Sequence, residues 1–314
     1  MAKQTQYAVP QTTLARRVEC SGIGLHSGQP ITMVLHPAAA NSGVSFRRVD
    51  LPGKPVIAAR HDNVTDLKLC TTVANAKGAK VATVEHLMAA LAGLGVDNVR
   101  IDIDGAEVPV MDGSSEPFVD AIERVGLVAQ DAARRYIRIL KTVEVRDGAR
   151  VARLEPANRF TVSMAIDFDS AAIGVQEVEV ELCHGAFRAE LAAARTFGFE
   201  HEVAQLHAMG LGKGGSLDNA VIVSGDRVLN EEGLRFDDEF ARHKALDAVG
   251  DLYLAGAPLL ARFHGERTGH ALNNRLLQAL FADETAWFYE TLSAGARLRP
   301  VPVYVHEGAL AAAE

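Results

Sequence analysis

The chain has 314 residues, 48% of them hydrophobic, which is enough to bury a substantial core and to form two domains of ordinary size. Its formal net charge is −8 and it contains no basic run or basic helix, which argues against a protein that mainly binds nucleic acid. Three scattered cysteines, Cys20, Cys70 and Cys183, form no Cys-x-x-Cys motif, which favours a reducing compartment.

The sequence further predicts a soluble, cytoplasmic protein. The first eight residues lack the apolar core of a signal peptide. No apolar run reaches the roughly 18 residues that a membrane-spanning helix requires.

In the first half, short strands are expected at 31–35, 44–47 and 99–103. Apolar residues at helical spacing predict a helix over 83–94, with Thr83 as its cap and Gly93 or Gly95 as its stop. A second helix is expected over 116–125, with Ser114 or Ser115 as the cap and Pro117 in its first turn.

A short polar stretch, 130–135, is interpreted as a linker between two domains, 1–133 and 134–314. Beyond it, strands at 137–140, 142–145 and 149–154 include a hairpin that turns at Asp147 and Gly148. Helices over 238–254 and 270–281 follow, separated by a strand at 259–263. Because the strands cluster in runs instead of alternating with helices, the sequence indicates two α+β halves.

His243 and Asp247 are four residues apart on the third predicted helix, so both side chains lie on one face, as two ligands of one metal ion would. A helical wheel places them opposite the apolar stripe of that helix, and places Glu85 and His86 opposite the stripe of the 83–94 helix. If each stripe covers its own sheet, the polar faces meet between the domains. Two imidazoles and one carboxylate would suit a catalytic zinc ion, but two ordinary solvated faces would give the same pattern.

Glu85 points about 100° away from His86 on the helix, so it is placed to act as a general base and not as a ligand. The alternative is a first-turn glutamate stabilised by the helix dipole. His270, at the start of another helix, is a candidate general acid or simply a surface residue. Asp251 is one turn beyond Asp247 and would either orient a catalytic histidine or be solvated.

A glycine-rich segment at 210–216 lacks the ending and the strand–loop–helix setting of a phosphate-binding loop, so it is interpreted as a flexible loop that borders a ligand. The segment 22–28 is similarly loop-like. No His-Glu-x-x-His motif supports a zincin protease.

Five segments in order resemble the bacterial UDP-3-O-acyl-N-acetylglucosamine deacetylases, and the resemblance runs from about Gln11 to the last predicted helix. They are VEHLMAALAGLGVDN (84–98), PVMDGSSEPF (109–118), ARTFGF (194–199), RHKALDAVGDL (242–252) and GHALNN (269–274). The resemblance implies two β-α-α-β sandwich domains whose helices pack against each other, plus a βαβ insert at about 198–228 that binds an acyl chain.

The resemblance also assigns roles to matching residues. It implies that His86, His243 and Asp247 bind zinc, that Glu85 is the general base, and that His270 is the general acid, oriented by Asp251. Thr196 matches a threonine that helps to hold the oxyanion, and Lys244 matches a lysine at the polar end of the substrate. Other matching residues are expected to contact the substrate: Leu25, Cys70, Phe197 and Ser216.

The implied reaction is zinc-dependent hydrolysis of the N-acetyl group of an acylated UDP-amino sugar, with release of acetate, at the committed step of lipid A synthesis. Alternatives are a zinc amidase for another acylated amino sugar and a non-catalytic sugar-nucleotide-binding protein. Fe²⁺ in place of Zn²⁺ also suits a His₂Asp site. A monomer is expected, since nothing in the sequence demands a partner chain.

Overall fold

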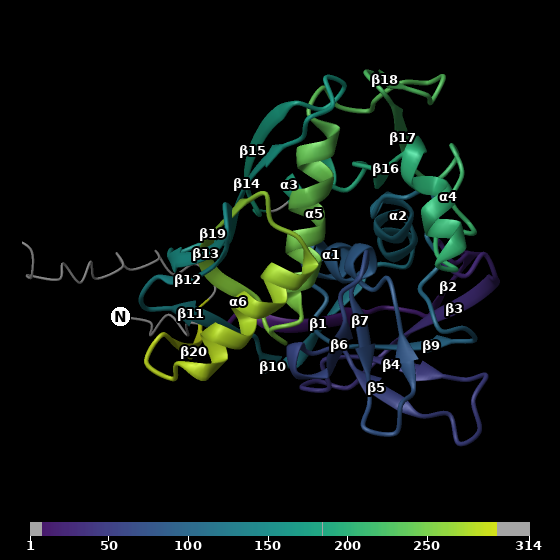
Figure 1. The fold of residues 1–314 in the computed structure, drawn as a ribbon. Coiled ribbons are helices and arrows are strands. Elements are labelled where there is room, and N and C mark those ends of the chain that lie inside the picture. The colour runs from purple at the N-terminus through teal and green to yellow at the C-terminus, as the bar shows by residue number, and fades with distance from the viewer. Residues whose placement is uncertain (1–7, 184, 294–314) are drawn as a thin grey trace, which may run out of the picture.

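The computed structural model describes residues 8–183 and 185–293. Of the eight residues on which the absence of a signal peptide is predicted, the first seven lie outside the described residues. Strands before residue 133 pair with one another, and strands after it do likewise (Figure 1). Within the described residues, an isolated bridge between Ala8 and Ser293 joins the two ends. The α+β architecture is therefore confirmed. No helix in the described part of the chain is both long and apolar enough to cross a membrane.

In the first half, a five-stranded sheet has the order β2-β3-β9-β4-β5, beside a three-stranded sheet β6-β7-β8 and the pair β1-β10. The bounds are β1 (Pro10–Leu14), β2 (Val18–Ile23), β3 (Pro30–Pro37), β4 (Val44–Arg48), β5 (Val56–Ala58), the 3₁₀ helix η1 (His61–Asn63), β6 (Val64–Asp66), β7 (Thr72–Ala74), β8 (Lys80–Val81), α1 (Glu85–Leu94), β9 (Val99–Ile103), α2 (Glu116–Val125) and β10 (Leu127–Ala133).

In the second half, a seven-stranded sheet contains β11, β12, β13, β14, β15, β19 and β20. The bounds are β11 (Arg135–Ile139), β12 (Val143–Asp147), β13 (Arg150–Pro156), β14 (Thr161–Asp167), β15 (Val175–Glu181), α3 (Ala186–Glu190), β16 (Phe197–Phe199), α4 (Glu200–Ala208), β17 (Val221–Ser224), β18 (Arg227–Val228), α5 (Glu239–Tyr253), β19 (Leu259–Glu266), α6 (His270–Ala282) and β20 (Trp287–Thr291).

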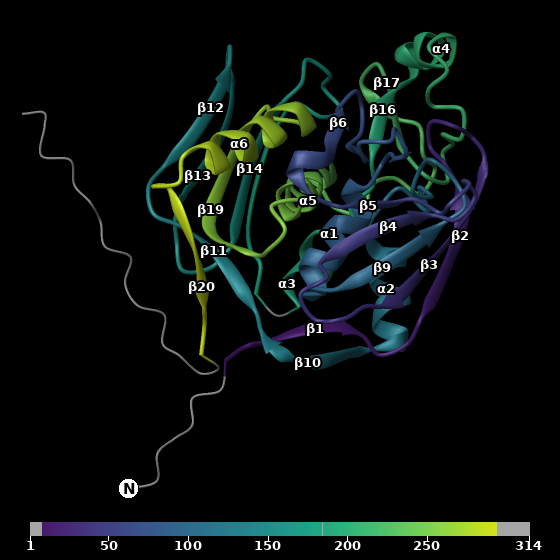
Figure 2. The same cartoon turned by 90° about the horizontal axis from the view of Figure 1, so that it is seen from below.

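The β16-α4-β17 unit is the predicted βαβ insert, because β16 and β17 are parallel and joined through α4. The hairpin predicted at Asp147 and Gly148 is also confirmed, with β12 and β13 antiparallel and Asp147 opposite Arg150. In both views the insert and this hairpin lie on opposite sides of α5 (Figures 1 and 2).

The predicted linker at 130–135 is wrong. Residues 130–133 belong to β10, which pairs antiparallel with β1, and residue 135 already begins β11. All residues of β10 are exposed or only half-buried. Its polar sequence therefore reflects a strand that faces solvent, while its backbone groups bond to β1.

The predicted cap of the first helix is also wrong. Thr83 has a φ of +55°, and its hydroxyl donates to the buried Glu107 carboxylate at 3.2 Å, so Val84 occupies the cap position without a side-chain bond. The predicted stop is correct, because Gly95 ends α1 in the left-handed conformation. At the start of α2, the two candidate cap serines make different hydrogen bonds. The Ser114 hydroxyl accepts the N–H of Glu116, whereas the Ser115 hydroxyl donates to the carbonyl of His86.

Candidate active site

The candidate site lies where α1 of the first half crosses α5 of the second. α5 packs on β14 and β15 of its own half, and Gly250 marks a close approach to α1, since a Cβ there would collide with the Glu85 carbonyl oxygen. The crossing brings the first turn of α1, with Glu85 and His86, beside the face of α5 that carries His243 and Asp247. The predicted meeting of the two polar faces is confirmed by this packing.

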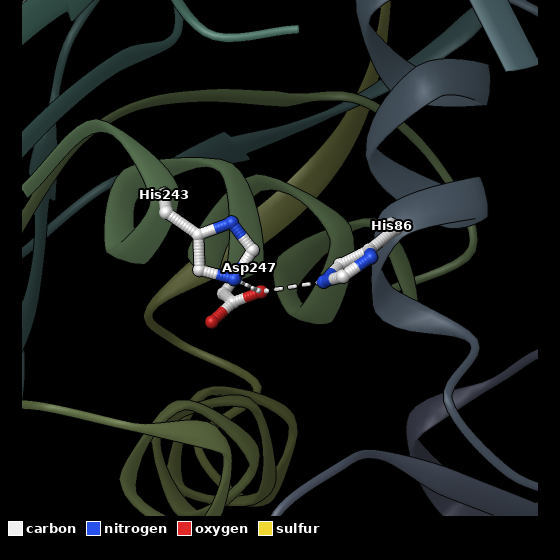
Figure 3. A group of neighbouring side chains, drawn as sticks. All are labelled: His86, His243 and Asp247. Carbon is white, nitrogen blue, oxygen red and sulfur yellow. Dashed lines mark ion pairs between the residues drawn. The ribbon is translucent and has the colours of Figure 1, made fainter. Parts of the chain in front are cut away.

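His86, His243 and Asp247 converge on one point from the two helices (Figure 3). Asp247 Oδ1 lies 3.5 Å from His86 Nε2 and 3.4 Å from His243 Nε2. Ligands about 2.0–2.1 Å from a tetrahedral zinc ion lie about 3.3 Å from one another, so these spacings fit such an ion. Among the described residues, this is the one group of three or more such side chains with metal-ligand spacing.

The chemistry of the three side chains also fits a cation. Asp247 Oδ1 is buried and has no hydrogen-bond partner, which is costly for a carboxylate unless a positive group faces it. Burial lowers the pKa of His243 to about 4, so the imidazole is neutral, as a metal ligand must be. Its Nδ1 donates to the Ala194 carbonyl at 3.1 Å, which leaves Nε2 free for an ion.

Glu85 lies beside this group but outside it. One of its oxygens accepts the backbone N–H of Thr71 at 2.9 Å, and the residue is almost fully buried. Burial raises the pKa of the Glu85 carboxyl above its usual range, although the nearby His270 and His86 oppose this. A carboxyl group with a raised pKa is suited to accept a proton near neutral pH.

His270 is not a surface residue. Its Nδ1 donates to Asp251 Oδ2 at 2.9 Å, and its Nε2 lies 3.9 Å from Asp247 Oδ2. Burial alone would lower the pKa of His270, but the carboxylates of Asp251, Glu85 and Asp247 together raise it to about 9, with Asp251 contributing most of the rise. Asn273 donates to the same Asp251 oxygen at 2.9 Å. His270 is therefore protonated at neutral pH and held in one orientation.

Lys244 points at the ligand group, with Nζ 2.8 Å from Asp247 Oδ2. Burial alone would lower its pKa, but the Asp247 carboxylate raises it, so the side chain is charged. Thr196 lines the same cleft and is held by backbone bonds to Gly113 and Val221. Next to it, the buried Arg195 bonds to Glu239, the first residue of α5, and so ties this loop to the helix that carries His243.

The three proposed ligands line a cleft of about 630 Å³ together with Glu85, Thr196, Lys244 and His270. From the insert and the loops that face it, the cleft receives a set of apolar side chains: Leu25, Leu67, Leu69, Phe168, Phe197 and Phe199. From the β12–β13 hairpin and the start of α6 it receives a set of cationic ones: Arg150, Arg267 and Arg275. The cleft therefore suits a ligand with both an apolar and an anionic part.

Of the candidate substrate contacts, Leu25 and Phe197 line the cleft, whereas Cys70 and Ser216 are not among its lining residues. Cys70 is buried beside Glu85, and burial raises the pKa of its thiol to about 11. Ser216 is exposed, in the glycine-rich loop. The composition of that loop predicts flexibility, but in the structure the loop is held: the N–H of Gly214 donates to the carbonyl of Leu25, and the N–H of Lys213 donates to that of His26.

Several residues of the site were missed by the sequence reasoning. Asn273 is three residues after His270 on α6, so helical spacing alone could have placed both beside the same partner. Thr71 contacts Asp251, 180 residues away, and no pattern in the sequence signals such a contact. The cleft arginines carried no motif either.

The chain is similar to proteins of one named family. The family model of UDP-3-O-acyl N-acetylglycosamine deacetylase matches residues 11–282. The chain is 47% identical to the UDP-3-O-acyl-N-acetylglucosamine deacetylase of Xylella fastidiosa (strain 9a5c), over 94% of this chain and 98% of that protein. The enzymes of that name from Stenotrophomonas maltophilia (strain K279a) and Xanthomonas axonopodis pv. citri (strain 306) are also 47% identical, over 93% and 94% of this chain and 97% and 99% of their own length. The chain belongs to the UDP-3-O-acyl N-acetylglycosamine deacetylase family.

Proposed function

We propose that this protein hydrolyses the N-acetyl group of UDP-3-O-(3-hydroxyacyl)-N-acetylglucosamine and releases acetate, at the committed step of lipid A synthesis. The observation that carries the proposal is the buried group of His86, His243 and Asp247, with Glu85 and the protonated His270 beside it. The names of the 47%-identical relatives supply the substrate class.

Each residue would have one task in this reaction. His86, His243 and Asp247 would hold Zn²⁺, which when bound polarises the amide carbonyl and lowers the pKa of the attacking water. Glu85 takes a proton from that water, and the Thr196 hydroxyl donates to the oxygen on which negative charge develops. His270 gives its proton to the departing amine, while Asp251 keeps the imidazole oriented.

The shape and charge of the cleft support an acylated nucleotide sugar as the substrate. Phe197 packs edge-on against Phe168 at 5.7 Å between ring centroids, so the insert offers an aromatic wall for an acyl chain. The cleft arginines can form charge-assisted hydrogen bonds with the oxygen atoms of a diphosphate. Lys244, which contacts the proposed ligand Asp247, lies beside the metal ligands in the same cleft.

We further propose that the two halves are domains that divide near residue 133, and that the protein works as a monomer in the cytoplasm. Sedimentation at the concentrations used for activity would test the monomeric state, and a dimer that is required for turnover would contradict it.

An assay of acetate release from zinc-loaded protein tests the proposed reaction. The acylated UDP-N-acetylglucosamine should yield acetate, and the unacylated sugar nucleotide should yield far less, because it lacks the chain that the insert would hold. Glu85→Gln is the matched control, since it keeps the size of the side chain but removes the base.

Two other results would support different functions. Equal hydrolysis of both sugars would favour an amidase with another acylated substrate. Binding without any acetate release would favour a non-catalytic sugar-nucleotide-binding protein. Metal analysis of protein purified from cells distinguishes Zn²⁺ from Fe²⁺, because a His₂Asp site suits both ions.

A further inference from the structure

Thr71 is a buried residue immediately before β7, in a loop of the first half that reaches the crossing of α1 and α5. Its backbone is attached to the start of α1 twice. Its N–H donates to Glu85 Oε2 at 2.9 Å, and its carbonyl accepts the N–H of Val84 at 3.2 Å. Thr71 is therefore held in place against the proposed base.

The side chain of Thr71 points across to the other half. Its hydroxyl donates to Asp251 Oδ1 at 2.6 Å, and both groups are buried. The second oxygen of Asp251 accepts from His270 and from Asn273, each at 2.9 Å. Among the described residues, the Thr71 hydroxyl is the one hydrogen-bond donor that reaches Oδ1.

We propose that Thr71 is a positioning residue. It fixes the position of the proposed base, Glu85, relative to Asp251, which lies in the other half and orients the proposed acid, His270. One side chain and one backbone N–H of a single residue contact both, so a shift at either group is transmitted to the other. The proposal rests on the proposed function, in which Glu85 and His270 exchange protons with the same substrate.

The hydroxyl is the part of this arrangement that a substitution can remove. Valine has nearly the shape of threonine, so Thr71→Val keeps the packing and the two backbone bonds but leaves Asp251 Oδ1 buried without a donor. Rotation of the carboxylate towards other donors then becomes favourable, because it would restore a hydrogen bond to Oδ1. Such a rotation changes the bond between Asp251 and His270. For comparison, hydrogen-bond partners that orient the ligands of a metal site typically contribute about 10- to 100-fold to affinity or activity.

The first measurement is the steady-state kinetics of acetate release. Thr71→Val should lower kcat about tenfold or more and leave KM within about twofold, because orientation of the acid matters in the transition state. Thr71→Ser, which restores the hydroxyl, should recover most of the loss. If Thr71→Val does not yield folded protein, Thr71→Ala, which only removes atoms, replaces it with the same expectation.

The matched control is Thr13→Val. Thr13 is also a buried threonine outside the cleft lining. Its hydroxyl donates at 2.6 Å to the carbonyl of Asn98 and accepts the N–H of Ala38 at 3.0 Å. This variant loses both bonds, so its stability should fall at least as much as that of Thr71→Val while kcat stays near the wild-type value. An equal loss of kcat in Thr13→Val would show that Thr71 acts only through stability, and would overturn the proposal.

A second measurement does not depend on turnover. The proton on His270 Nδ1, which is bonded to Asp251, can be observed by NMR with ¹⁵N-labelled histidine. Its resonance should shift in Thr71→Val, return in Thr71→Ser and stay unchanged in Thr13→Val. If the wild-type protein released no acetate, the proposed function would fail, yet this resonance would still test the coupling. A resonance and a kcat that are both unaffected by Thr71→Val would refute it.

Discussion

His243 and His270 have the same side chain and line the same cleft, but their surroundings shift their pKa values in opposite directions. Burial dominates at His243 and lowers its pKa to about 4. At His270, burial also lowers the pKa, but the Asp251 carboxylate, with Glu85 and Asp247, raises it to about 9. The neutral imidazole of His243 is thereby suited to bind a cation, and the protonated imidazole of His270 is suited to donate a proton. The difference comes from burial and neighbouring charges and not from the side chain itself.

The pH dependence of kcat/KM should therefore be bell-shaped. The base Glu85 must be ionised, so activity falls as the pH drops through its raised pKa, and the acid His270 must be protonated, so activity falls as the pH rises towards about 9. A bound cation adds positive charge and lowers both values. Asp251→Asn removes the charge that raises the His270 pKa, so it should move the alkaline limb to lower pH; an unmoved limb would assign that limb to another group.

Thr196→Ala should slow turnover by roughly a hundredfold, because a donor aimed at the developing oxyanion is typically worth about 3–4 kcal/mol. Thr196→Ser keeps the hydroxyl and is the matched control. Metal content should stay unchanged in both variants, since Thr196 lies outside the group of His86, His243 and Asp247. Turnover at the wild-type rate in Thr196→Ala would remove this residue from the mechanism.

At the scale of the elements, the crossing of α1 and α5 creates the site. Helical periodicity predicted the two helices, their bounds to within about two residues and the polar face that each would present. It could not predict that the helices approach closely enough to bring three ligand atoms together. That approach depends on Gly250, whose missing side chain admits the backbone of α1.

Gly250→Ala should force α1 and α5 apart, because the new methyl group meets backbone atoms of Glu85 and Ala89, which cannot rotate away. Overpacking of this kind typically costs about 1–3 kcal/mol. Separation of the helices also moves His86 away from His243 and Asp247, so the affinity for Zn²⁺ should fall about tenfold or more. Titration with a zinc-binding dye and thermal unfolding would measure both effects.

The control for this variant is Gly93→Ala, on α1. There the new methyl group meets the side chain of Phe187, on α3, and not the backbone of a facing helix. Stability should fall while zinc affinity is retained. Equal zinc affinity in wild type and Gly250→Ala would mean that the helix spacing does not control the site.

At the scale of the whole molecule, a contact between the insert and the first half holds Leu25, one of the residues that line the cleft. The glycine-rich loop after α4 packs against the loop at 24–28, and Gly214 donates to the carbonyl of Leu25. Its composition suggested mobility, because glycines lower the cost of disorder as readily as they permit close contact. Only the folded chain shows that here they permit close contact.

Gly214→Ala should displace this loop, because a Cβ at that position would collide with the carbonyl oxygen of Gly24. Since Leu25 and the insert together supply apolar walls of the cleft, KM for the acylated substrate should rise about tenfold, with zinc content unchanged. Gly215→Ala, whose methyl group would lie 3.2 Å from its nearest neighbour, is the milder control. A higher KM for the unacylated sugar alone would contradict this role of the insert.

The sequence by itself determined the α+β class, the main helices, the βαβ insert and the candidate residues of the reaction, because periodicity and residue type are local properties and the family motifs are contiguous. It misjudged β10 and Thr83, where the partner of a polar residue is distant along the chain. Only the tertiary structure decided that Glu85, His86, His243, Asp247 and His270 meet in one cleft, and that Thr71 joins its two sides. Those contacts depend on how closely two helices pack, and that is set by side chains too far apart in sequence to form a pattern.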